Sequence, residues 1–106
     1  MKKFLVLGLM VLSADSFASI GGCTSPEEII CVDYTGTIWA QDPEAVMQSC
    51  TAEGGTFSAN GCKTAGKIGG CLMYEDQAIE YLINFYTPME VADAKSGCDA
   101  DGGLWK

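Results

Sequence analysis

Apolar and polar residues alternate along two stretches of the chain, and this alternation predicts β-strands. The stretches are IICVDYTG, residues 29–36, and AIEYLINFYT, residues 78–87, and both are rich in β-branched and aromatic residues. In the second stretch four apolar residues share one face at a period of two: Ile79, Tyr81, Ile83 and Phe85. Glu80 and Asn84 lie on the other face, which is therefore partly polar. A polar turn precedes each stretch, so each should be the second strand of a hairpin.

Two helices are predicted after these strands, and each is indicated by the residues at its ends. Asp42 and Thr87 are N-cap residue types, and each is followed by a proline at the expected first helical position. The sequence TPME also has the spacing of a capping box. The helical segments PEAVMQSCTAE and PMEVADAKSGCDAD lead to Gly54 and Gly102, a residue type that favours the left-handed conformation after a helix. The segments TFS and LWK that follow are expected to be short strands.

The order of these elements repeats once along the chain. IGGC at residues 20–23 recurs 48 positions later at residues 68–71. The same shift carries CTAEGGTF, residues 50–57, onto CDADGGLW, residues 98–105. Agreement at both ends of the unit indicates a tandem duplication of one supersecondary unit.

The repeat predicts the fold class and the division of the chain. Each unit should contain a hairpin, a helix and a short final strand, so two copies make an α+β domain. We expect one small disulfide-stapled domain of two tandem β-β-α(-β) units, residues 19–106, with the helices packed on an antiparallel sheet. The units are residues 20–57 and 68–105, and residues 58–67 form the linker between them.

Residues 1–18 have the pattern of a secretory signal peptide. Lys2 and Lys3 precede the apolar run FLVLGLMVL, and SADSFA ends in a small-x-small cleavage site at Ala18. The apolar run is too short to span a bilayer as a helix, so no transmembrane segment is expected. The mature chain should start near Ser19 and be exported to the periplasm, the cell envelope or the medium.

A lipid anchor is the alternative to a freely secreted chain. In that case Cys23 would be the acylated cysteine of a lipoprotein, with the preceding IGG as a loose lipobox. A lipobox normally adjoins the apolar run, whereas Cys23 lies well downstream of it.

The six cysteines all lie in the exported part of the chain. An even number in a short exported chain predicts a disulfide framework. The repeat favours three bridges: Cys23–Cys50, Cys31–Cys62 and Cys71–Cys98. An alternative that joins Cys31 to Cys50 and Cys23 to Cys62 stays open. Each bridge should contribute about 3 to 4 kcal/mol in the chain-entropy model.

The charge and the missing residue types exclude several classes of function. The net charge of −8 repels nucleic-acid phosphates and anionic lipid headgroups, so neither is an expected partner. The chain has no histidine and no arginine, which removes histidine-dependent catalysis and histidine-ligated metals. No Cys-x-x-Cys motif is present, so the cysteines are expected to be structural. We expect no enzyme activity, no cofactor and no metal.

The acidic pairs of the chain are weak candidates for a site. They are Glu27/Glu28, Glu75/Asp76 and Asp99/Asp101. Paired carboxylates can perform acid–base hydrolysis, but in an acidic protein they more often form a solvated rim. Residues 99–102, DADG, resemble the start of a calcium loop, yet the later ligands are absent and the repeat makes the segment a helix end.

The aromatic residues are better candidates for binding. Trp39, Tyr74, Tyr81 and Tyr86 could form a flat platform for a sugar or a protein if they lay on an open face of the sheet. Core packing is the alternative role for each of them.

The combined motifs resemble those of a family of small cysteine-rich exported proteins and lipoproteins of Gram-negative bacteria. The resemblance rests on CVDYTG, CTAEGGTFS, GKIGGC and DAKSGCDADGGLW, and it covers nearly all of residues 20–106. It implies export and a disulfide framework, and it implies no activity.

The function expected from the sequence is therefore a non-catalytic structural or binding module of the cell envelope or exterior, with a protein or glycan partner. A small protease inhibitor or effector is the alternative, in which SANG, residues 58–61, would be an exposed loop held between Cys50 and Cys62. A hydrolase that uses paired carboxylates is a third hypothesis.

Overall fold

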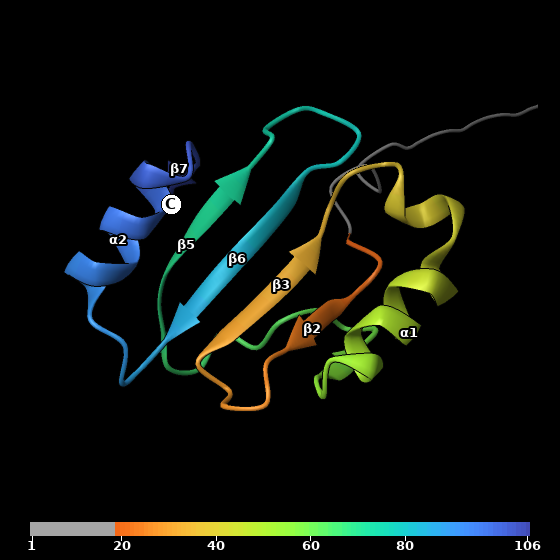
Figure 1. Cartoon of the computed structure of the whole chain (residues 1–106), viewed down its shortest axis with the longest axis horizontal. Coiled ribbons are helices and arrows are strands. Elements are labelled where there is room, and N and C mark those ends of the chain that lie inside the picture. The colour runs from red at the N-terminus through yellow and green to blue at the C-terminus, as the bar shows by residue number, and fades with distance from the viewer. Residues whose placement is uncertain (1–18) are drawn as a thin grey trace, which may run out of the picture.

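The two alternating stretches form the central strands of an antiparallel sheet. The computed structural model describes residues 19–106, and the expected signal peptide lies outside them. Within this part of the chain the sheet has six strands in the order β4-β2-β3-β6-β5-β7 (Figure 1). The strands are β2 (Gly22–Thr24), β3 (Ile30–Tyr34), β4 (Thr56–Ser58), β5 (Lys67–Met73), β6 (Tyr81–Tyr86) and β7 (Leu104–Trp105). The predicted α+β class with an antiparallel sheet is confirmed.

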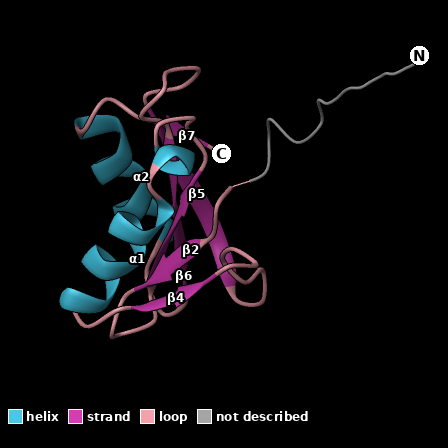
Figure 2. Cartoon of the chain, turned by 90° about the vertical axis from the view of Figure 1, so that its right-hand side faces the viewer, coloured by secondary structure: helices cyan, strands magenta, loops and turns pink. Residues whose placement is uncertain are grey.

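Both helices lie on the same side of the sheet, as Figure 2 shows. Helix α1 (Pro43–Ala52) follows a 3-10 turn at Trp39–Gln41, and helix α2 is Val91–Ala100. The Asp42 side chain caps α1 by accepting a hydrogen bond of 3.3 Å from the Ala45 backbone N–H. Gly54 and Gly102 follow the helix ends with φ of 85° and 82°, so the predicted left-handed glycines are confirmed.

The predicted start of α2 at Pro88 is wrong. The helix begins at Val91, and Glu90 at its N-cap makes no side-chain capping bond. The cause is a contact with a distant part of the chain: the Thr87 N–H donates to the Gly66 carbonyl at 3.0 Å. Thr87 is therefore held beside the start of β5, and a turn from Tyr86 to Met89 separates it from the helix.

Three disulfides connect the described residues, and they are the pairs that the repeat favours. They are Cys23–Cys50, Cys31–Cys62 and Cys71–Cys98. Cys23–Cys50 joins β2 to α1, and Cys71–Cys98 joins β5 to α2. The alternative pairing, with Cys31 joined to Cys50, is not the one observed.

The core beneath α2 is tightly packed. Cys71, Met73 and Cys98 are buried there, and four partly buried side chains surround them: Tyr81, Ile83, Phe85 and Trp105. The Phe85 and Trp105 rings stack with their centroids 5.9 Å apart. Tyr81, Ile83 and Phe85 thus share a face as predicted, whereas Ile79 lies before the strand and is exposed.

The glycines of the repeated motifs pack closely against disulfides and aromatic rings. A Cβ at Gly55 would lie 2.8 Å from the Cys23 sulfur, and one at Gly103 would collide with the Cys71 sulfur. Gly21 lies against the Phe57 ring, and Gly69 against the Trp105 ring. The same contact therefore occurs twice, at positions 48 apart, because only glycine leaves room for it.

The opposite face of the sheet is covered by the segment that links β4 to β5. Alternation along β3 points Cys31 away from the helices, where it is bonded to Cys62 of this segment. Asn84 is 1% exposed beneath it. Its amide donates to the Asp33 carboxylate at 3.0 Å and to the Cys31 carbonyl at 3.1 Å. The partly polar face of β6 is therefore buried against a hydrogen-bonded network.

Candidate functional site

Three of the four candidate aromatic residues lie at one end of the central strands. Tyr81 begins β6, and the Tyr74 ring lies 5.9 Å from it beyond the end of β5. Tyr34 at the end of β3 is the cross-strand partner of Tyr81, and its ring lies 5.3 Å from that of Trp39. These four residues form an aromatic row that crosses the sheet in the order Trp39, Tyr34, Tyr81, Tyr74.

Tyr86, the fourth aromatic candidate, does not belong to the aromatic row. It is 2% exposed and lies on the opposite face of the sheet. Its hydroxyl donates to the Lys63 carbonyl at 2.7 Å, and the Lys63 ammonium lies 5.6 Å from the ring centroid. Tyr86 therefore anchors the segment between β4 and β5 and offers no exposed platform.

Two hollows lie between α1 and the sheet, and Tyr34 lines both of them. Toward the N-terminal end of α1 lies a hollow of about 420 Å³, lined by Tyr34, Ile38, Trp39 and the inner side of the helix. Toward the other end lies a hollow of about 210 Å³, lined by Tyr34, Pro26, Ile30 and the Cys23–Cys50 bridge. We call these two hollows together the α1 groove.

A difference between the two halves of the chain explains one of these hollows. Ser25 lines the smaller hollow, and the residue 48 positions later is Met73. Met73 is buried in the core beneath α2, where its sulfur lies next to the Cys71 sulfur. The short serine side chain leaves the corresponding space beneath α1 unfilled. The first half of the chain therefore has a groove where the second half has a packed core.

Two carboxylates mark the ends of the α1 groove. Asp42 lines the larger hollow at the start of α1, and Glu53 lines the smaller one at the end of the helix. Burial raises the pKa of Tyr34, and the negative charge of Glu53 raises it further. Burial also raises the pKa of Tyr81, with contributions from Tyr74 and Asp101. The tyrosines are therefore neutral hydrogen-bonding groups in acidic surroundings.

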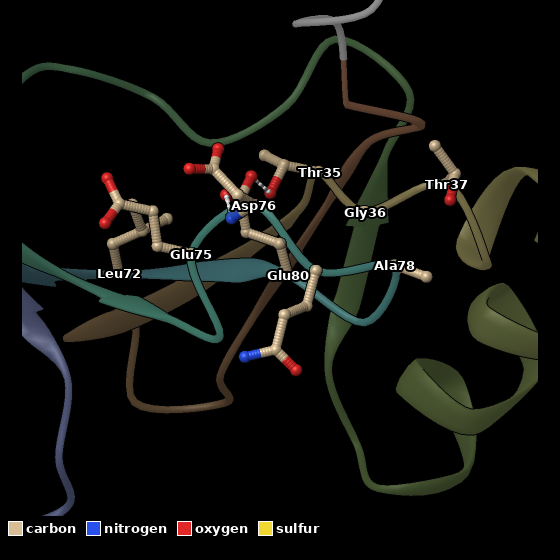
Figure 3. A pocket seen from close by; sticks show the side chains of 9 residues that line it. Thr35, Gly36, Thr37, Leu72, Glu75, Asp76, Ala78 and Glu80 are labelled. Carbon is tan, nitrogen blue, oxygen red and sulfur yellow. Dashed lines mark hydrogen bonds between the residues drawn. The ribbon is translucent and has the colours of Figure 1, made fainter.

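The Trp39 ring is fixed in place by the β6 end of the sheet. Its indole N–H donates to the Glu80 carbonyl at 2.8 Å. The Glu80 side chain points to a different hollow, of about 340 Å³, between the β5–β6 turn and the segment after β3 (Figure 3). One carboxylate oxygen accepts from the Thr35 hydroxyl at 2.6 Å, and the other accepts from the Asp76 N–H at 2.9 Å. Glu80 thus acts as a structural brace for the turn.

The acidic pairs are not brought together into one site. Glu75 and Asp76 line the hollow of Figure 3, in the hairpin turn where the sequence places them. Glu27 and Glu28 lie in the exposed turn before β3, and Asp99 and Asp101 lie at the exposed end of α2. Among residues 19–106 no group of three or more histidine, cysteine, aspartate or glutamate side chains could hold a metal ion.

The SANG segment forms a compact turn at the end of β4. The Gly61 N–H donates to the Ser58 carbonyl at 3.1 Å, and the Asn60 N–H donates to the Ser58 hydroxyl at 3.3 Å. Ala59 and Asn60 are exposed at its tip. The turn is closed by its own hydrogen bonds and does not present an extended stretch of backbone.

The sequence reasoning missed Tyr34 as a candidate binding residue. Tyr34 follows Ile30 and Val32 at a period of two, and this signal places its ring on the same face as the strand's apolar residues. The α1 groove was also missed, because it depends on how α1 lies against β3. Chemically, the groove offers aromatic and aliphatic contact surface with an acidic group at each end.

In the described part of the chain no helix is both long and apolar enough to cross a membrane. Comparison with protein-family models, with curated proteins and with solved structures finds no match to the chain.

Proposed function

We propose that the protein is a non-catalytic binding module of the cell envelope or exterior, and that it binds its partner in the α1 groove. The observation that carries this proposal is the contrast between the two helices. Beneath α2 the space is filled by Met73, Phe85 and Trp105, whereas beneath α1 two hollows meet at Tyr34. Apolar concave surfaces that carry a few polar groups are the usual form of binding sites.

A tandem duplication explains how such a contrast would arise. The sheet order β4-β2-β3-β6-β5-β7 places three strands of each half on either side of the β3–β6 contact. The helix ends, the glycine contacts and two of the disulfides recur 48 positions apart. In this proposal one copy keeps the packed core that stabilises the domain, and the other copy has lost core volume and gained a binding surface.

Nuclear magnetic resonance can test the groove directly, because the chain has two tryptophans whose indole N–H signals report different places. Trp39 lines the α1 groove, and Trp105 lies in the core beneath α2. The isotopically labelled mature protein would be titrated with a neutral oligosaccharide, a basic peptide and an acidic peptide. We expect at least one probe to shift the signals of Trp39 and Tyr34 and to leave that of Trp105 unchanged.

The outer side of α1 provides the internal control. Met47 and Thr51 lie there and line a shallow hollow that faces away from the sheet. Shifts confined to these residues, or no shifts with any probe, would contradict the proposed groove. Turnover of a substrate that is lost in a single acidic variant would contradict the non-catalytic role.

A further inference from the structure

We propose that the α1 groove binds an extended basic segment of a protein partner, and this inference rests on the proposed function. The segment would place an aliphatic or aromatic side chain against Tyr34 and cationic side chains at Asp42 and Glu53. Three features of the groove support this occupant: its apolar floor, the position of its two carboxylates and the absence of basic residues from its lining.

The floor of the groove suits apolar side chains. Ile38, Val46 and Trp39 line the larger hollow together with Tyr34. Ile38 is 40% exposed, so part of its side chain is open to a partner in this hollow. The Trp39 ring is held by its hydrogen bond to Glu80, so it is already ordered before a partner binds. Ordered aromatic rings contribute contact area at a small entropic cost.

The spacing of the carboxylates sets the length of the segment. Asp42 and Glu53 flank the ten residues of α1, and a helix rises by about 1.5 Å per residue, so they lie about 16 Å apart along the groove. An extended peptide covers about 3.3 Å per residue. Two basic residues about five positions apart on one peptide could therefore reach both carboxylates while the residues between them contact Tyr34.

The charge of the molecule selects a cationic occupant. The chain has a net charge of −8, and the lysines of the described residues, Lys63, Lys67, Lys95 and Lys106, are absent from the lining of both hollows. A second copy of the chain would bring like charges together, which opposes association. A neutral glycan could stack on the aromatic row and donate hydroxyl hydrogen bonds to Asp42 and Glu53, but it would gain no charge attraction from these carboxylates.

The experiment measures binding of a synthetic peptide of about nine residues with two lysines about five positions apart and apolar residues between them. A second peptide with glutamates in place of the lysines is the matched probe, and a neutral oligosaccharide is the third. The protein variants are Asp42→Asn with Glu53→Gln in one chain, and Glu44→Gln alone. Asparagine preserves the helix cap. Glu44 lines the hollow on the outer side of the same helix, so its variant controls for the loss of one negative charge outside the groove.

We expect the lysine peptide to shift the Trp39 indole signal and the glutamate peptide to leave it unchanged. The double variant should raise the dissociation constant about tenfold at low salt, because two partly exposed ion pairs are removed. Glu44→Gln should change it by less than about twofold. Raising the salt concentration should weaken binding to the unmodified protein and have little effect on the double variant.

Three results would overturn the inference. Equal effects of Glu44→Gln and of the double variant would show only a response to net charge. A double variant that binds the lysine peptide normally would remove the role of the two carboxylates. Binding of the oligosaccharide, and not of the lysine peptide, at Trp39 would leave the groove as the binding site and refute a basic partner. If none of the probes shifted the Trp39 signal of the unmodified protein, the proposed function itself would be contradicted.

Discussion

Removal of the two helix-anchoring disulfides, one at a time, tests how differently the two halves are packed. Cys23–Cys50 and Cys71–Cys98 both have a sequence separation of 27 residues. In the chain-entropy model, a disulfide that closes a loop of this size stabilises the folded state by about 3.5 kcal/mol. Equal loops mean that any difference between the double alanine variants reports the surroundings of the sulfur atoms and not the loop.

The surroundings differ in a way that predicts the order of the two variants. Cys71 is 1% exposed within the core beneath α2, whereas its counterpart Cys23 is only half-buried; Cys98 and Cys50 are equally buried, at 3%. Each truncation there should add about 1 kcal/mol for the cavity. Cys23 and Cys50 line the smaller hollow of the α1 groove, so their truncation enlarges a space that is already open.

We therefore expect Cys23→Ala with Cys50→Ala to lower the free energy of unfolding by about 3.5 kcal/mol. Cys71→Ala with Cys98→Ala should lower it by about 5.5 kcal/mol. Both values are measured by urea denaturation followed by tryptophan fluorescence. Circular dichroism, recorded in parallel, provides an independent probe of unfolding. A larger loss for the Cys23–Cys50 pair, or equal losses, would refute the contrast between a packed and an open half.

Three further predictions concern packing and processing. Asn84→Asp should lower the free energy of unfolding at neutral pH by about 3 kcal/mol, because it buries a second carboxyl beside Asp33. Acidic pH should restore part of this loss. Equal losses in urea denaturation at neutral and acidic pH would contradict the prediction. Gly103→Ala should destabilise by about 2 to 3 kcal/mol through collision with Cys71, whereas Gly97→Ala, in an open helical position, should stabilise by up to about 1 kcal/mol in the same assay. Intact mass of the exported protein should show a chain that starts at Ser19 and is two hydrogens lighter per disulfide, and a diacylglycerol adduct on Cys23 would contradict it.

The elements and disulfides were predictable because their signals are local and occur twice. A cap at Asp42 and a glycine after each helix give the helix ends, and each is satisfied by residues within one turn. The repeat then links cysteines that are far apart in the sequence. The spacing of the cysteines alone leaves the disulfide pairing open. The boundaries of the two units decide it, because each unit has one cysteine near its start and one near its end.

Features that depend on contacts between distant segments were not predictable. The start of α2 was misplaced because the bond from Thr87 to Gly66 holds Thr87 beside the start of β5, and a turn from Tyr86 to Met89 follows the strand before the helix begins. Asn84 was placed on a partly polar face, but the segment between β4 and β5 covers that face. The smaller hollow of the α1 groove follows from the short side chain of Ser25, where the second half has Met73, and a missing core volume leaves no periodic signal.

Alkaline titration tests the environment of Tyr34 and Tyr81 in the aromatic row and of Tyr86 beneath the segment between β4 and β5. Burial is the main cause of the raised pKa values of Tyr34, Tyr81 and Tyr86, and neighbouring carboxylates add to it at all three. Because the unfolded chain releases these protons at lower pH, the stability of the fold should be fully present below about pH 10 and should decrease as the pH rises above it. Ultraviolet absorbance should show that these tyrosines ionise at a higher pH in the folded protein than in the urea-unfolded chain. Glu53→Gln should bring the Tyr34 titration closer to its ordinary value, and an unchanged titration would show that Glu53 does not act on the groove.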